Sequence, residues 1–133
     1  MEVMDEMGWT PLHFASYNGR LDVVQFRVKN KVDVNAKDEF GSTPLHRASY
    51  SGQFDVVKFL VENKADIHAM NDYGVTPLHL ASRFGHLDVV EFLVENKADI
   101  NAKNNKGETL LNIAKQNYKT SVTEYLRSEG GVE

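Results

Sequence analysis

Short apolar faces at helical spacing alternate with polar, turn-forming segments along this chain, and the alternation returns every 33 residues. In the clearest period, residues 77–84 carry a short apolar face and residues 87–95 carry a broader one. Thr76 is a good N-cap, and Pro77 suits the first helical position because its missing N–H would have no partner there. Gly85 then ends the helix after about two turns. The pattern predicts two helices per period, the second from about Leu87 to Glu95.

The same period appears in a short motif. Thr-Pro-Leu-His begins at Thr10, Thr43 and Thr76, and a worn form, Thr-Leu-Leu-Asn, begins at Thr109. A fixed period of this size indicates one supersecondary unit stacked along a line, with a turn or hairpin such as residues 98–106 between units. Such a stack presents a surface rather than a deep pocket, which favours a binding module over an enzyme. The 133 residues accommodate four units in one continuous stack.

Longer motifs connect this period with a known family. They are Gly-x-Thr-Pro-Leu-His, Ala-Ser-x-x-Gly-His-Leu-Asp-Val-Val and Ala-Asp-Ile-Asn-Ala-Lys, and over about residues 8–128 the chain resembles the ankyrin repeat. The resemblance implies an all-α solenoid of stacked helix-turn-helix units, with projecting hairpin loops and a concave groove formed by the hairpins and the first helices. It also implies protein binding without catalysis. We expect one domain over 1–133, with repeats at about 8–40, 41–73, 74–106 and 107–128 and a frayed tail at 129–133.

Departures from the family pattern give local expectations. Lys31, Lys64 and Lys97 stand where the family usually has glycine. Either these lysines adopt a left-handed backbone, at a cost of about 1 kcal/mol each, or the preceding asparagines do. Arg27 replaces a leucine and is interpreted as a crude N-terminal cap. Because no other residue caps that end, it should be the weaker one, or the chain is a piece of a longer array. Arg47 replaces an apolar residue inside the stack. We expect its stem to pack while the guanidinium reaches water; the alternative is that it faces a partner.

Variable positions within this constant frame carry the binding hypothesis. They flank the glycine before Thr-Pro and lie at the end of each first helix, and in the family such positions line hairpin tips and concave helix surface. Aromatic side chains and arginine dominate interface energetics. Some rings could instead only cover the loops of neighbouring units. The predicted partner-binding residues are Met7, Trp9, Tyr17, Phe40, Ser42, Tyr50, Ser51, Tyr73, Val75, Arg83 and Phe84.

Other polar residues recur in register and are interpreted as structural. His13, His46 and His79 lie one unit apart, so they cannot converge on one metal. The resemblance implies that each histidine hydrogen-bonds a loop of the adjacent unit. The aspartates at 33, 66 and 99 are typical of turn-binding residues. No phosphate loop, dinucleotide fingerprint or catalytic motif is present in the sequence, so we expect no enzyme activity, cofactor or metal.

Composition limits the partner class. The net charge of −4 gives no electrostatic signature for nucleic acid or an anionic membrane. There is no cysteine for a disulfide or thiolate metal site. No apolar run approaches the ~20 residues that span a bilayer, and Met1–Met7 is too short and acidic for a signal peptide. These features favour a cytoplasmic or nuclear setting and a chain that is monomeric on its own.

Two function classes stay open at this point. The leading one is a non-enzymatic protein–protein interaction module that binds a protein partner through an aromatic-rich concave face, as a natural fragment or an engineered binder. The alternative is a structural or regulatory spacer domain of a larger protein, whose aromatic patch packs against another domain of the same polypeptide. A sizing experiment separates them, because a spacer fragment with a bare patch should self-associate.

Overall fold

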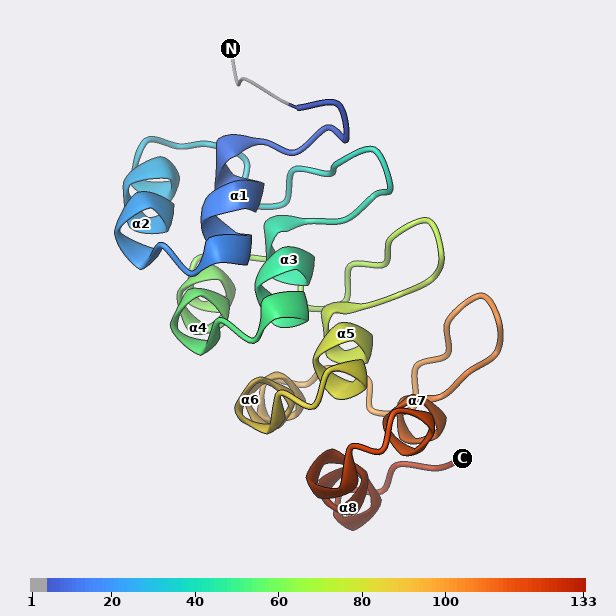
Figure 1. Cartoon of the computed structure of the whole chain (residues 1–133). Helices are drawn as coiled ribbons and strands as arrows, with labels where there is room; N and C mark the ends of the chain where they lie inside the picture. The colour runs from blue at the N-terminus through green and yellow to red at the C-terminus, as the bar shows by residue number, and fades with distance from the viewer. Residues whose placement is uncertain (1–4) are drawn as a thin grey trace.

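Each Thr-Pro unit begins a helix in the computed structural model, which describes residues 5–133 (Figure 1). Part of the Met1–Met7 segment lies outside the described residues. Within them the helices follow one another as four pairs and no strand occurs, so the expected all-α repeat architecture is confirmed. The pairs are α1 (Pro11–Asn18) with α2 (Leu21–Lys29), α3 (Pro44–Ser51) with α4 (Phe54–Glu62), α5 (Pro77–Arg83) with α6 (Leu87–Glu95), and α7 (Leu110–Gln116) with α8 (Thr120–Ser128).

The first helix of every pair begins at a reciprocal cap. In α3, the Thr43 hydroxyl oxygen accepts a hydrogen bond from the backbone N–H of His46 at 3.3 Å, and Nδ1 of His46 accepts one from the backbone N–H of Thr43 at 3.1 Å. The cap satisfies N–H groups that have no partner inside the helix. It recurs in α1, α5 and α7, with Asn112 in the place of histidine in α7. The Thr-Pro-Leu-His motif therefore fixes where these helices begin.

In the first three pairs, a lysine with a left-handed backbone follows the asparagine that caps the second helix. Lys31, Lys64 and Lys97 have φ of 63°, 75° and 76°. The asparagine before each lysine keeps a negative φ, so the alternative that asparagine adopts this conformation is wrong. The asparagine is held by its own side chain, since Nδ2 of Asn63 donates to the Phe59 carbonyl at 2.8 Å. The left-handed conformation that ends the helix therefore falls on the lysine that follows.

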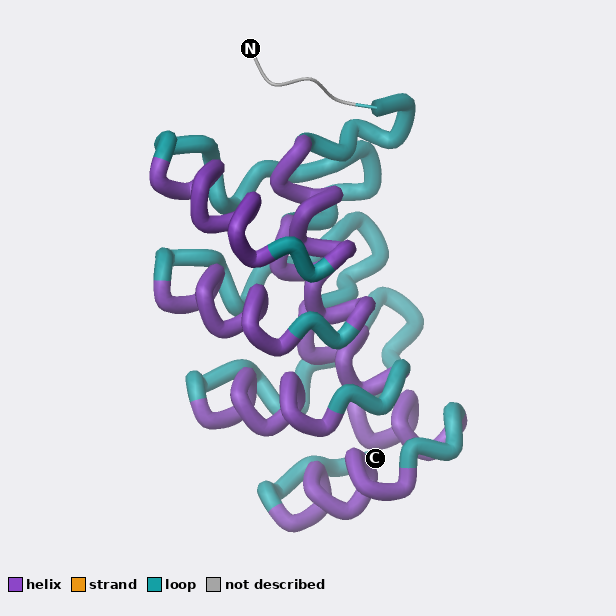
Figure 2. Tube along the Cα trace, turned by 60° about the vertical axis from the view of Figure 1, so that its left-hand side comes forward, coloured by secondary structure: helices purple, strands orange, loops and turns teal. Residues whose placement is uncertain are grey.

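The helices form two rows. In Figure 1, α1, α3, α5 and α7 follow one another beside the projecting loops, and α2, α4, α6 and α8 form the row on the other side. Figure 2 shows the units stacked in successive levels from the N-terminal to the C-terminal end. The core runs between the rows without a break, and its leucines recur in register. They are Leu12, Leu45, Leu78 and Leu111 in the first helices and Leu60, Leu93 and Leu126 in the second helices.

The two ends of the stack differ. Helix α2 buries only Val24, and Phe26 on the same helix is 63% exposed. Arg27 is half-buried, and its Nε has no hydrogen-bond partner among the described residues. At the other end, residues 129–133 were expected to fray. They contact the body instead, with the Val132 N–H donating to Oδ1 of Asn101 at 3.1 Å.

No helix in the described part of the chain has the length and apolar character needed to cross a membrane. The two rows of helices give two candidate surfaces for function, the row of α2, α4, α6 and α8 and the row beside the loops. The variable aromatic residues lie in or next to the second of these rows, since they occur in the loops or at the C-terminal ends of α1, α3 and α5.

Candidate functional site

One side chain shapes each loop that carries variable residues. In the loop before α5, Oδ1 of Asn71 accepts hydrogen bonds from the backbone N–H groups of Tyr73 at 2.9 Å and Val75 at 3.1 Å. The loop folds around this amide, and the residues on both sides of the glycine are fixed together. The same position in the 33-residue register is held by Asp5, Asp38, Asn71 and Asn104. Our sequence interpretation missed it, although the recurrence is visible in the sequence.

Neighbouring loops are also joined through the backbone of the variable residues. The carbonyl oxygen of Met7 accepts from the next loop at 2.8 Å, that of Phe40 at 2.9 Å and that of Tyr73 at 3.0 Å. These bonds use only main-chain atoms of the variable residues. Their side chains can therefore change without breaking the bonds between loops. The main chain of these residues supports the fold, and their side chains are available to form the surface.

The aromatic side chains form two groups. The helix-end row contains Trp9, Tyr17, Tyr50 and Phe84, whose successive ring centroids lie 5.5, 5.9 and 4.6 Å apart. The tip pair is Phe40 with Tyr73, whose centroids lie 6.5 Å apart. These separations are typical of favourable aromatic pairs. Both aromatic groups thus cross the boundaries between units.

The rings reach solvent while they pack on one another. Tyr17 and Tyr50 are each 37% exposed and Tyr73 is 59% exposed, whereas Trp9 and Phe40 are half-buried. Phe14 also contacts Trp9, at 5.0 Å between centroids, and is exposed. Sequence interpretation left Phe14 out because its register position is apolar in the other units except for Arg47. The structure adds it to the surface beside the helix-end row.

The backbone of the helix-end row is held by the following unit. The Tyr17 carbonyl accepts from Oγ of Ser51 at 2.7 Å, and the Tyr50 carbonyl accepts from Nε2 of His86 at 3.0 Å. The hydroxyl of Ser51, a predicted partner contact, therefore donates its hydrogen bond within the protein. His86 thereby has a structural role.

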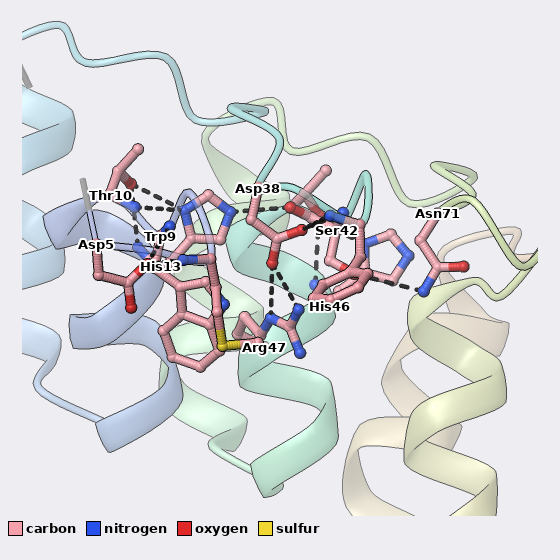
Figure 3. Close-up of polar contacts among 12 residues, drawn as sticks. Asp5, Trp9, Thr10, His13, Asp38, Ser42, His46, Arg47 and Asn71 are labelled. Atoms are coloured by element: carbon pink, nitrogen blue, oxygen red, sulfur yellow. Dashed lines mark hydrogen bonds and ion pairs between the residues drawn. The ribbon is translucent and has the colours of Figure 1, made fainter.

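Arg47 does not send its guanidinium into water, and that expectation was wrong. Its Nη2 lies 2.5 Å from Oδ2 of Asp38, and the guanidinium carbon lies 4.7 Å from the centre of the Trp9 ring (Figure 3). The Asp38 side chain is fully buried. Burial raises the pKa of Asp38, but hydrogen bonds from Arg47 and the backbone N–H of Ser42 outweigh it, so the pKa lies below its usual value. An ion pair therefore anchors this loop to α3.

The remaining predicted contacts differ in accessibility. Met7 is exposed and Val75 is half-buried. Arg83 is exposed, with its guanidinium carbon 5.6 Å from the centre of the Phe84 ring. Ser42 is only 2% exposed, so it does not belong to an accessible surface. It was included because its position is variable, but in this unit the small side chain is buried in the loop, where its Oγ accepts a hydrogen bond from Nδ2 of Asn71 at 3.4 Å.

The register histidines link adjacent units as expected in two of three cases. Nδ1 of each ring accepts a backbone N–H at its cap, so the neutral ring carries its proton on Nε2. That N–H donates to the Ser42 carbonyl from His13 at 2.9 Å and to the Val75 carbonyl from His46 at 2.8 Å. His79 makes no such bond. Burial lowers the pKa of all three rings, that of His46 to about 4.

The aspartates at 33, 66 and 99 bind turns as expected, each accepting a backbone N–H two residues ahead. Within residues 5–133, no group of three or more His, Cys, Asp or Glu side chains is placed to hold a metal ion. The predicted residues that reach solvent include the aromatic rings of Tyr17, Tyr50 and Tyr73 and the guanidinium of Arg83.

Comparison with known families gives one match. A family model described as ankyrin repeats (3 copies) matches residues 1–71, 28–104 and 78–133, which together span the chain. A search of curated proteins finds none that matches it.

Proposed function

The chain belongs to the ankyrin-repeat family, and on this premise we propose that it is a non-enzymatic module that binds a protein partner through the helix-end row and the tip pair. Ankyrin repeats are general protein–protein interaction modules, and the family is typically non-enzymatic. We place the partner on the concave side of the stack, beside the loops. We also propose that residues 1–133 form one domain that is monomeric without its partner.

One observation carries this proposal: partly exposed rings stand on a backbone that the next unit already holds. Tyr50 is the central case, since its ring contacts Tyr17 and Phe84 while its carbonyl accepts from His86. Ordering side chains costs free energy on binding. Rings that are already ordered in the free protein avoid much of this cost and bury large apolar areas against a partner.

The partner surface that fits these rings is an apolar protein segment. The helix-end row and the tip pair present ring edges and faces, with Met7 exposed at the tip of the first loop. Arg83 adds one cation beside Phe84. Arginine and aromatic rings together are the residue types that contribute most to protein interfaces.

The test is a quantitative pull-down with the Tyr50→Ala, Tyr73→Ala double variant. A specific protein should be enriched by the intact chain and lost with the variant, and the melting temperature should stay within a few degrees because both carbonyls remain. The direct affinity of the enriched protein should then be measured by calorimetry with purified components.

A matched control comes from the helix row of α2, α4, α6 and α8. Phe26 on α2 is more exposed than either tyrosine and contacts none of the rings of the helix-end row or tip pair within aromatic pairing distance. Phe26→Ala should therefore leave the partner bound. Equal loss with both variants, or retention with the tyrosine variant, would refute the assignment.

A further inference from the structure

The C-terminal tail, residues 129–133, folds back against the fourth unit (Figure 1). The Val132 N–H donates to Oδ1 of Asn101 at 3.1 Å. An inner unit contains the same bond, since the Asp66 N–H donates to Oδ1 of Asn35 at 2.8 Å, also across 31 residues. Residue 132 therefore takes the register position of Asp66, and the tail has a defined place on the stack.

The tail brings a carboxylate to two cations. Oε1 of Glu133 accepts a hydrogen bond from Nζ of Lys115 on α7, and it lies 3.6 Å from Nη2 of Arg127 on α8. The Lys115 ammonium, with a smaller effect of the Arg127 guanidinium, holds the pKa of Glu133 below its ordinary value. The three side chains are between 41% and 53% exposed, so water screens the contact and another carboxylate can replace Glu133.

The same two cations line a groove of about 300 Å³ along α8 and the loop that joins it to α7, which we call the end groove. The charged residues of its lining are three cations and one carboxylate, namely Lys115, Lys119, Arg127 and Glu124. Tyr118 adds a ring that is 90% exposed. The end groove is therefore positive within a chain whose net charge is −4, and an excess of positive charge attracts acidic groups.

The 33-residue register shows that stacking does not require these cations. Lys115 stands where the first three units have serine, and Arg127 stands where they have valine. Those serines are fully buried, whereas Lys115 is exposed on the last described unit. A terminal unit needs a polar outer face, but polarity alone does not select two cations that converge on one carboxylate.

We propose that the end groove binds an acidic segment of a partner protein, with one carboxylate on Lys115 and Arg127 and a neighbouring acidic residue toward Lys119. In the free protein Glu133 holds the first two cations and acts as an internal competitor. A carboxylate suits this pair because it only accepts hydrogen bonds, and bonds between charged groups are the stronger ones. The end groove lies on the fourth unit, whereas the helix-end row ends at Phe84 in the third, so this inference goes beyond the proposed function and does not depend on it.

Fluorescence anisotropy of a rhodamine-labelled peptide with four consecutive glutamates tests the end groove. The full chain should bind this peptide saturably and should not bind the matched peptide with four glutamines. The Lys115→Gln, Arg127→Gln double variant should weaken binding about fivefold, because each exposed ion pair contributes modestly. The Lys29→Gln, Lys58→Gln double variant removes the same charge from exposed positions on α2 and α4, and it should leave the affinity within about twofold.

The tail supplies a second comparison. Glu133→Gln removes the internal carboxylate and should strengthen peptide binding about twofold or more. Glu129→Gln removes the same charge from the tail but breaks no ion pair among the described residues, so its effect should be smaller. Equal strengthening by both variants would overturn the role of Glu133 as competitor.

Two other results would overturn the binding site itself. Equal weakening by the two double variants would mean that the peptide responds only to net charge. Displacement of the peptide by inorganic phosphate as readily as by unlabelled peptide, at matched ionic strength, would reduce the end groove to a site for simple anions. The substituted side chains are exposed, so each variant should keep its fold, which circular dichroism checks. Tyr50 and Tyr73 are unchanged throughout, so the pull-down tests the proposed function separately.

Discussion

At the scale of single residues, the Asp38–Arg47 pair explains the least regular position in the repeat. The equivalents of this pair in the third unit are Asn71 and Leu80, in which neither side chain is charged. Asp38 accepts two backbone N–H groups through Oδ1, which leaves Oδ2 for Arg47. A buried carboxylate needs a compensating charge. Arginine at position 47 is therefore the consequence of aspartate at position 38.

This pairing predicts a strongly coupled double-mutant cycle. Arg47→Leu alone should lower the free energy of unfolding by about 3 kcal/mol, because it leaves the Asp38 carboxylate buried without its partner. Adding Asp38→Asn should recover most of that loss, since Asn71 and Leu80 show that the fold accommodates the neutral pair. Urea unfolding of the four proteins measures the coupling. Strictly additive losses would mean that the ion pair does not hold the loop.

The structural environment of a residue could be predicted from the sequence where the 33-residue register repeats, and less well where the register breaks. The left-handed lysines were one of two expected alternatives, and the asparagine side-chain bonds decided between them. The environment of Arg47 was missed because its partner is nine residues away in a loop. Ser42 was placed on the surface because its position varies. Neither error concerns local helix propensity; both concern how side chains pack where a loop meets α3.

At the scale of elements, the cap histidines make helix stability depend on pH. His46 is neutral in the folded protein, with a pKa of about 4 against an ordinary 6.5, because burial disfavours its charged form. Between about pH 4 and pH 6.5, His46 therefore binds a proton in the unfolded chain but not in the folded chain. The stabilisation is complete above pH 6.5 and is lost progressively as the pH falls toward 4. Over that window His46 contributes roughly 3 kcal/mol.

We expect urea midpoints to fall steadily from pH 7 to pH 4.5, with His13 and His79 acting in the same direction. The matched variant is His46→Asn, because Asn112 completes the same cap in α7 without titrating. This variant should be less stable at pH 7, having lost the bond to Val75, but its stability should depend less on pH. An unchanged slope would show that other groups control the acid sensitivity.

The elements themselves were the most predictable level. The second helix of the third unit was expected from about Leu87 to Glu95, and α6 has those bounds. Caps and apolar spacing act locally, so they are readable in one sequence. The loops were expected to be turns or hairpins. In the described residues they form no strand, but each closes through single backbone bonds, such as that from the Asn71 N–H to the Val75 carbonyl at 3.0 Å, and Lys103 and Thr109 form an antiparallel bridge.

At the scale of the whole molecule, burial is uneven along the stack. Helix α2 has one buried residue, Val24, whereas the equivalent helices α4 and α6 have three each. In a linear array each unit is stabilised by its own packing and by its neighbours. The first unit of this chain is weak in its own packing, because α2 buries a single residue, and among the described residues it has a neighbour on one side only. Local unfolding should therefore begin there.

Amide hydrogen exchange followed by mass spectrometry tests this gradient. We expect α1 and α2 to exchange first and the helices of the second and third units last. Val24 and Val57 form a matched pair, since both are fully buried and occupy the same register position. Val24→Ala should accelerate exchange in α1 and α2 while leaving α5 and α6 nearly unchanged. Val57→Ala should accelerate exchange on both sides of α4, because its unit supports two neighbours. Equal acceleration of every helix by both variants would instead mean that the stack unfolds only as a whole. The aromatic surface would then show no difference in local stability between its two ends.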